Sequence, residues 1–145
     1  MGLECRTLTQ ADPDFAHCAA IRTEVFVVEQ HVPVAEELDD LDATAKHVLA
    51  TVDGVPVGTG RLILAGNAPA RVGRMAVLAS HRRRGVGSAI LLNLMELARQ
   101  AGTPTVTLSG QVHAIPFYER HGFVAHGEIY LDAGIEHRTM DRDLP

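Results

Sequence analysis

The chain has few cysteines and no long hydrophobic run. Its 145 residues include two cysteines, Cys5 and Cys18, without CxxC or metal-ligand spacing, so both thiols are expected to be reduced, as in a cytoplasm. No stretch reaches the roughly 18 consecutive apolar residues that a membrane-spanning helix needs. The segment MGLECRTLTQ lacks the apolar region of a secretory signal. These absences argue against a membrane protein and favour a cytoplasmic location.

One long segment of the chain contains no acidic residue, and another contains no lysine or arginine. No acidic residue lies between Asp53 and Glu96, where the arginines at 61, 71, 74 and 82–84 are found. No lysine or arginine lies between Arg22 and Lys46, a segment whose seven acidic residues are Glu24, Glu29, Glu36, Glu37, Asp39, Asp40 and Asp42. The net charge of −5 argues against general nucleic-acid binding, which favours basic domains. The basic segment fits a local anion site and the acidic segment would attract a cation, unless either is simply a solvated face.

The length and the order of predicted elements indicate one domain over residues 1–145 with a mixed α/β fold. Asp12 as N-cap and Pro13 at the first helical position predict a helix over 12–26. The segment 31–44 is predicted as a loop or short helical turn. A second helix is expected over 86–101, ended by Gly102, and a short one over 113–122. Strands are predicted over 3–9, 46–52, 55–65, 70–78, 103–109, 123–131 and 135–144.

The predicted sheet is mostly antiparallel. Turn signals at Asp53-Gly54 and Gly66-Asn67 separate three successive strands that should pair antiparallel. The crossover through the helix over 86–101 is long enough for the strand over 103–109 to lie parallel to the strand over 70–78. We therefore expect one parallel strand pair among antiparallel neighbours, flanked by helices.

The segment SHRRRGVGSAI, residues 80–90, places three arginines where a helix begins. Cations are disfavoured at a helix N-terminus, so a bound anion is expected to offset them. A P-loop would need Gly-Lys-Ser/Thr, and a dinucleotide fingerprint would need a third glycine at Ile90. A solvated basic turn is one remaining interpretation. The other is a pyrophosphate site, in which glycines let the backbone approach and the helix N–H groups and arginines bind the phosphates.

The run RRRGVG, residues 82–87, resembles the Arg/Gln-x-x-Gly-x-Gly/Ala motif of the GCN5-related N-acetyltransferases (the GNAT superfamily). It follows the strand VGRMAV and opens a long helix, as in that family. RTEVFVVEQHV, EELDDLD, FYERHGF and GIEHRTM resemble an ElaA-like bacterial branch. The resemblance covers nearly the whole chain.

The resemblance implies acetyl-CoA as the acetyl donor. Its pantetheine arm would pair with the strand at Met75, Ala76 and Val77, from which the strand TVTLS would splay apart. The N–H near Val77 would polarise the thioester carbonyl. Phe117 would be a packing residue against CoA, and His113 stands where the family often has a cofactor-binding Asn. The pyrophosphate would lie, with Arg82 closing the loop, on the backbone of Arg83, Arg84, Gly85, Val86, Gly87 and Ser88.

Acetyl transfer to an amine needs a proton acceptor for the amine and a proton donor for the leaving thiolate. Tyr118 matches the family's tyrosine donor; the alternative is a core tyrosine with its hydroxyl paired. The base is left open, because Glu29, Asp39, Asp40, Glu128 and His137 are all candidates and family members also use water. Among these, Glu29 and His137 are our catalytic candidates beside Tyr118.

The sequence and the resemblance thus predict an acetyl-CoA-dependent N-acetyltransferase for a small-molecule or peptide amine. A homodimer is the assembly that the resemblance implies. The eight histidines show no HExxH or other ligand spacing, so no metal is expected. No nucleic-acid or membrane partner is expected. The alternative function is a catalytically silent CoA-binding regulatory module.

Overall fold

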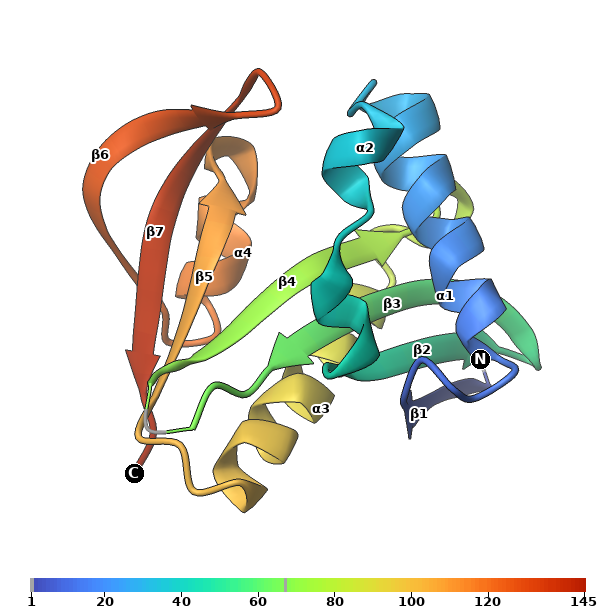
Figure 1. Cartoon of the computed structure of the whole chain (residues 1–145), viewed down its shortest axis with the longest axis horizontal. Helices are drawn as coiled ribbons and strands as arrows, with labels where there is room; N and C mark the ends of the chain where they lie inside the picture. The colour runs from blue at the N-terminus through green and yellow to red at the C-terminus, as the bar shows by residue number, and fades with distance from the viewer. Residues whose placement is uncertain (1, 67) are drawn as a thin grey trace.

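Seven strands form one sheet in the order β1-β2-β3-β4-β5-β7-β6 (Figure 1). The computed structural model describes residues 2–66 and 68–145. The strands are β1 (Leu3–Leu8), β2 (Lys46–Val52), β3 (Val55–Ile63), β4 (Ala70–Val77), β5 (Thr105–Gln111), β6 (Val124–Asp132) and β7 (Ile135–Asp143). The helices are α1 (Phe15–Arg22), α2 (Val34–Glu37), α3 (Val86–Gln100) and α4 (Ile115–Glu119). Short π- and 3₁₀-helical segments are η1 (Thr23–Glu29), η2 (Asp40–Ala43), η3 (Ala79–His81) and η4 (Val112–Ala114).

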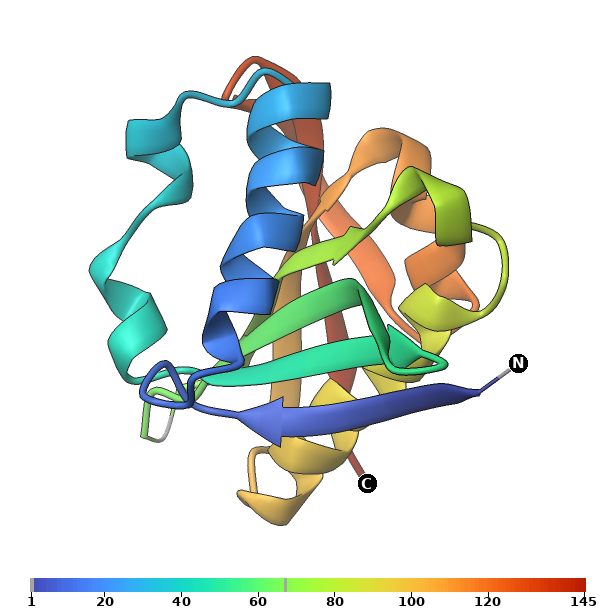
Figure 2. The same ribbon diagram turned by 90° about the vertical axis from the view of Figure 1, so that its right-hand side faces the viewer.

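The predicted strand pairing is confirmed. β4 and β5 are the parallel pair, and the other neighbouring strands pair antiparallel. Figure 2 shows β1 at one edge of the sheet, beside β2 and β3. At the predicted turns, Asp53, Gly54 and Gly66 have positive φ, and Asn67 lies outside the described residues. The sheet is therefore mixed, mostly antiparallel, with helices on its faces.

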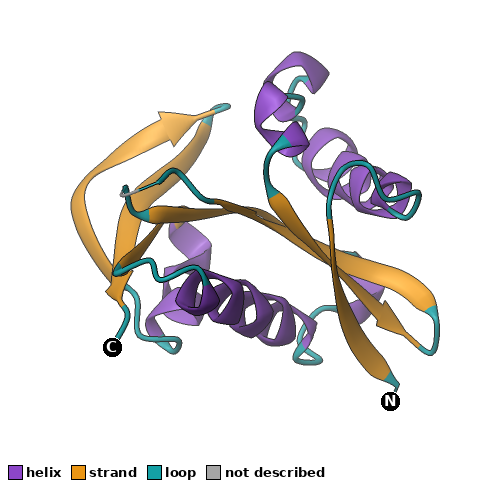
Figure 3. Cartoon of the chain, turned by 60° about the horizontal axis from the view of Figure 1, so that its bottom comes forward, coloured by secondary structure: helices purple, strands orange, loops and turns teal. Residues whose placement is uncertain are grey.

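Helices α1 and α3 lie on opposite faces of the sheet (Figure 3). The apolar side of α3 is fully buried through Ile90, Leu91 and Leu94. This helix lies close to β3, because a Cβ added at Gly60 would be 2.7 Å from Cγ2 of Ile90. A second buried cluster beneath α1 consists of Leu8, Cys18, Ile21, Val25, Leu49 and Ala76. No helix of the described residues is long and apolar enough to cross a membrane.

The first helix differs from the prediction at both ends. It begins at Phe15, not near Asp12, and helical structure continues as the π-helix η1 to Glu29. The carboxylate of Asp12 accepts hydrogen bonds from the guanidinium of Arg6 at 2.8 and 3.0 Å and from the N–H of Asp14 at 2.9 Å. The prediction of Asp12 as N-cap was wrong because this ion pair holds residue 12 in a turn before the helix.

Candidate active site

β4 and β5 part halfway along their length. Their parallel pairing covers Ala70–Val72 with Val106–Leu108 and then stops. Beyond that point β4 remains paired with β3 as far as Val77, and β5 remains paired with β7 as far as Gln111. The divergence is visible in Figure 1. It opens a cleft of about 560 Å³ between the two halves of the sheet.

A bulge in β4 accompanies the parting. Thr59 pairs with Ala76 and Arg61 pairs with Gly73, so Arg74 and Met75 together oppose Gly60. Such an extra residue bends a strand and redirects its side chains. Arg74 has φ +51, in the left-handed region that non-glycine residues rarely adopt. The side chains of Arg74 and Met75 line the cleft.

The backbone of Val77 faces the cleft. The N–H of the next residue, Leu78, donates to the carbonyl of Val57 on β3 at 2.9 Å. Because successive backbone groups in a strand alternate in direction, the N–H and carbonyl of Val77 point away from β3, toward the parted β5. The carbonyl accepts a hydrogen bond from Nε of Arg82 at 2.9 Å, so the N–H of Val77 is the group that an extended ligand lying along β4 can pair with.

A second hollow, of about 320 Å³, lies at the start of α3 and shares Val77 and Arg82 with the cleft. The first backbone bond of α3 runs from the N–H of Ala89 to the carbonyl of Gly85 at 3.1 Å. The N–H groups of residues 86–88 precede it and are available to an anion. Gly85, with φ +80, forms the turn into the helix. Arg83, Gly85, Gly87, Ser88 and Phe117 all line this hollow.

Glycine at position 87 is not required by the protein itself. Its φ is not positive, and a Cβ there would lie 3.5 Å from the Phe117 ring, an ordinary contact. A side chain at this position would instead occupy the hollow. The predicted close approach of a ligand to the backbone is thus compatible with the structure.

The three arginines of the loop have different surroundings. Arg82 donates from Nε to the carbonyl of Val77 at 2.9 Å and from Nη2 to both carboxylate oxygens of Glu29, at 2.9 and 2.8 Å. Arg83 and Arg84 are exposed. Two predicted site residues, Arg82 and Glu29, thus form an ion pair in the structure. Val86 is 1 % exposed and belongs to the core beneath the loop.

Tyr118 lies at the edge of the cleft on α4. Its ring packs edge-on against Phe117 and Phe123, with centroid distances of 5.1 and 6.1 Å. Burial raises the pKa of its phenol to about 12. The hydroxyl is therefore protonated at neutral pH and remains a proton donor.

His137, on β7, also lines the cleft and is 9 % exposed. Its Nδ1 lies 2.7 Å from the carbonyl oxygen of Ile135. A carbonyl only accepts, so this contact requires the proton on Nδ1 and leaves the lone pair of Nε2 free in the neutral ring. His113 and Ala76 line the same cleft.

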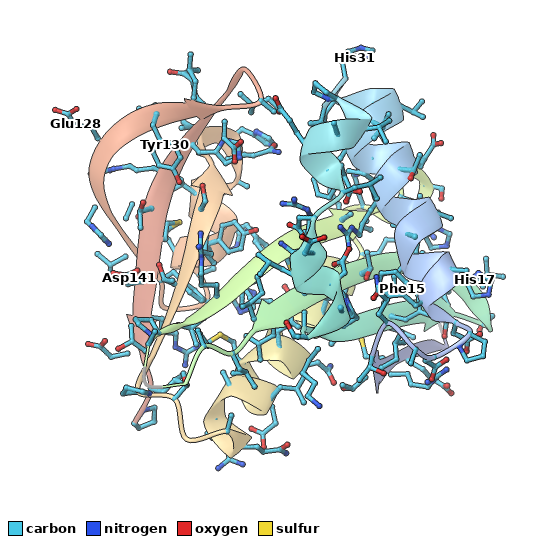
Figure 4. The ribbon with its side chains drawn as sticks, viewed as in Figure 1. Phe15, His17, His31, Glu128, Tyr130 and Asp141 are labelled. Carbon is cyan, nitrogen blue, oxygen red and sulfur yellow. The ribbon has the colours of Figure 1, made fainter. Side chains whose placement is uncertain are left out.

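Tyr130 is a site neighbour that the sequence analysis missed. Its ring stacks on His137 at 6.1 Å and 23°, and its hydroxyl bonds to the hydroxyl of Ser109. Figure 4 shows Tyr130 on β6, while Glu128, an earlier base candidate, lies at the outer edge of that strand, away from the cleft. Counting back from the two-residue turn at Ala133-Gly134 pairs residue 130 with residue 137 and would have found this contact.

The acidic segment is largely neutralised by buried arginines. Arg22 donates to Glu37 at 2.5 Å and to Asp42 at 2.8 Å. Arg61 donates to Asp39 at 2.7 Å and to Asp42 at 3.1 Å. The interpretation of the whole segment as a cation-attracting face is corrected, because Glu37, Asp39 and Asp42 are paired internally and Glu29 is paired with Arg82.

These contacts form one network of Arg22, Arg61, Arg74, Glu37, Asp39 and Asp42. Four of its members, Glu37, Asp39, Arg61 and Arg74, line the cleft. Burial alone would raise the pKa of Asp42, but the hydrogen bonds and charges of Arg22 and Arg61 outweigh it and lower that pKa. Among the described parts of the chain, no group of three or more His, Cys, Asp or Glu is placed to hold a metal ion.

The parted parallel pair, the open helix N-terminus beside it and the continuous cleft define the class of acyl-CoA N-acyltransferases. A family model described as an acetyltransferase (GNAT) domain matches residues 9–144. The chain belongs to the GNAT acetyltransferase family.

Several known proteins are similar over nearly their full length. The uncharacterized N-acetyltransferase YjcF of Bacillus subtilis is 40% identical over 124 residues, covering 85% of this chain and 88% of YjcF. The crystal structure of an acyl-CoA N-acyltransferase from Pseudomonas aeruginosa has a TM-score of 0.86 at 32% identity, covering 97% of this chain and 99% of that one. Escherichia coli ElaA has a TM-score of 0.87 at 26% identity, with the same coverage.

The buried network predicts a loss of stability in acid. Because the pKa of Asp42 is lower in the folded chain, its ion pairs stabilise the fold above about pH 4 and this contribution is lost as the pH falls through the folded-state pKa. Asp42→Asn should lower the free energy of unfolding at pH 7 by about 3–5 kcal/mol, since it leaves buried arginine charge uncompensated. Urea unfolding at a series of pH values measures both effects.

The matched control is Asp40→Asn, which changes an exposed carboxylate two residues away. It should change stability by less than about 0.5 kcal/mol. Equal effects of the two substitutions would contradict the structural role of Asp42.

Proposed function

We propose that this chain is an acetyl-CoA-dependent N-acetyltransferase that acetylates a primary amine of a small molecule or peptide by direct attack in a ternary complex. The observation that supports the proposal most is that the cleft between β4 and β5 and the hollow at the start of α3 adjoin each other, since Val77 and Arg82 line both. One hollow presents helix N–H groups suited to phosphates, and the other presents a free strand edge with Tyr118 and His137. Membership of the GNAT family supports the same activity.

The residues present fit acetyl-CoA. The N–H groups of residues 86–88, with Arg83 and Arg84, would hold its pyrophosphate, and the lack of a side chain at Gly87 lets the phosphates approach the backbone. The free edge of β4 at Met75–Val77 would hold the pantetheine arm. When bound, acetyl-CoA supplies an activated acetyl group. The N–H of Val77 would then donate to the carbonyl oxygen and stabilise its developing charge.

Two side chains of the cleft provide the proton transfers. Tyr118, protonated at neutral pH, donates its phenolic proton to the departing sulfur. His137 accepts a proton from the attacking amine at Nε2, because its Nδ1 is held by the carbonyl of Ile135. Glu29 is less suited to this role, since both of its oxygens accept hydrogen bonds from Arg82.

The phosphate site predicts a strong effect of Gly87→Glu on acetyl-CoA binding. The substitution fills the hollow and adds a negative charge beside the helix N-terminus, so affinity measured by calorimetry should fall at least about tenfold. Arg83→Gln removes one exposed charge and should weaken binding by less. Gln100→Glu adds the same charge at the other end of α3 and serves as the control. Equal affinities for wild type and Gly87→Glu would exclude the proposed phosphate site.

Acetyl transfer itself is tested by thiol release. Wild type with acetyl-CoA and a panel of primary amines should release one CoA thiol for each amine acetylated. Tyr118→Phe keeps the ring and removes the proton donor, so kcat should fall about 100-fold with little change in acetyl-CoA affinity.

If Tyr118→Phe retains the wild-type kcat, Tyr118 is not the proton donor and serves only in packing. If calorimetry shows acetyl-CoA binding but no amine of the panel is acetylated, the catalytically silent CoA-binding module becomes the better description.

The two base candidates predict opposite results. His137→Gln should lower kcat/KM for the amine about 100-fold, because the side chain that accepts the proton is lost. Glu29→Gln, at saturating acetyl-CoA, should retain activity within about threefold, a change worth less than 1 kcal/mol of barrier. The reverse order of activities would assign the base to Glu29.

A further inference from the structure

Arg74 is the cationic group of the buried network that the cleft can reach. The bulge in β4 directs it to the cleft, where its side chain is 27 % exposed. Nη2 donates to the carbonyls of Glu36 and Glu37 at 3.3 and 3.2 Å and to Oδ2 of Asp39 at 3.2 Å. Nε is buried and out of reach of a ligand, whereas no group of the described residues accepts a hydrogen bond from Nη1. Part of this guanidinium is therefore not used by the protein.

The charge of Arg74 is also the least compensated of the three arginines. Arg22 and Arg61 contact carboxylate oxygens at 2.5–3.1 Å, whereas the carboxylate contacts of Arg74 are 3.2 and 3.6 Å. Burial, together with the neighbouring charges of Arg61 and Arg22, lowers the pKa of Arg74. The pKa of Arg22 is raised, because its bonds to Asp42 and Glu37 outweigh its burial. An additional anion near Arg74 would relieve this imbalance.

A second arginine faces the same part of the cleft. Arg71 is exposed, lines the cleft and forms no ion pair with any residue of the described ranges. Between the two arginines, Gly73 leaves the floor open, because a Cβ there would meet no atom within 4 Å. Beneath them, Arg61 is 4 % exposed, so it adds positive charge to the floor without offering an accessible donor. The floor thus combines open space with the two arginines that line the cleft and are accessible to a ligand, Arg71 and Arg74.

We propose that the amine acceptor also carries a carboxylate, which binds to Arg74 and Arg71 on the floor of the cleft. The acceptor is then an amino acid or a short peptide. This inference rests on the proposed acetyltransferase activity and names its substrate class. It replaces the expectation that the acidic segment would attract a cation.

A carboxylate fits this floor better than a phosphate. Guanidinium groups bind both anions in a bidentate manner. However, Glu36 and Asp132 also line the cleft, and they repel a dianion more strongly than a monoanion. The same two acidic residues are compatible with the ammonium group of a zwitterionic acceptor.

The experiment compares matched acceptors that differ only in the anion. β-Alanine, γ-aminobutyrate and glycylglycine are each assayed against their carboxamides, and aminoethylphosphonate is assayed against β-alanine. Steady-state thiol release gives kcat and KM, and calorimetry in the presence of CoA gives acceptor affinity independently of turnover. The proteins are wild type, Arg74→Gln, Arg71→Gln and, as control, Arg99→Gln, which changes an exposed arginine on α3.

The carboxylates should be preferred to the carboxamides by about 10- to 100-fold, mainly in KM, as expected for hydrogen bonds to a charged group. Arg71→Gln should reduce this preference while leaving the kinetics of the carboxamides unchanged. Arg74→Gln should also reduce the preference, and Arg99→Gln should leave it intact. If Arg74→Gln fails to fold, the result with Arg71→Gln tests the proposal by itself. Arg71 forms no ion pair with the described residues, so its substitution should not affect folding.

Equal use or equal binding of acid and amide, no binding of either, or a preference for the phosphonate would overturn the inference. Acetylation of amides and acids alike would keep the proposed function while rejecting the carboxylate site. If calorimetry shows that the acids bind more tightly than the amides but no thiol is released, the carboxylate site stands and the proposed acetyl transfer is rejected.

Discussion

The parting of β4 from β5 after Val72 is the constraint on which the rest of the structure depends. A backbone N–H or carbonyl that loses its strand partner must find another, in water or in a ligand. Here each strand keeps its other neighbour, so the sheet stays intact while one inner edge becomes free. That edge presents backbone groups to the cleft, and its rigidity comes from the paired strands behind it. The cleft and the strand edge at Val77 both follow from this single break.

The buried ion network connects β4, on one side of the cleft, to the segment that contains α2. The carbonyls of Glu36 and Glu37 accept hydrogen bonds from Arg74, so the short helix α2 is tied to the bulge of β4. Pairing within such a network offsets the cost of burying charge only when all partners are present. One consequence is that an acidic run in the sequence leaves little free negative charge in the cleft. Another is that the least compensated member, Arg74, lies where a substrate can meet it.

Much of the fold and of the loop that opens α3 was predictable. The loop 82–88 and the N-terminus of α3 are local features, so their spacing in the sequence is also their arrangement in space. The acceptor side was not predictable to the same degree. Tyr130 meets His137 across a strand pair, and the pairing of Arg82 with Glu29 joins residues 53 positions apart. The start of α1 was also misjudged, because Arg6 on β1 draws Asp12 out of the cap position.

By itself, the sequence determined the order of strands and helices, the parallel strand pair and the position of the arginine- and glycine-rich loop before α3, since these depend on periodicity, turn residues and the length of the crossover. Only the tertiary structure decided which charges remain free. Arginines at 22, 61 and 74 and the carboxylates at 37, 39 and 42 are separate blocks in the sequence, and folding brings them together at ion-pair distance. Electrostatic interactions depend on distance and burial, which the linear order of residues does not contain.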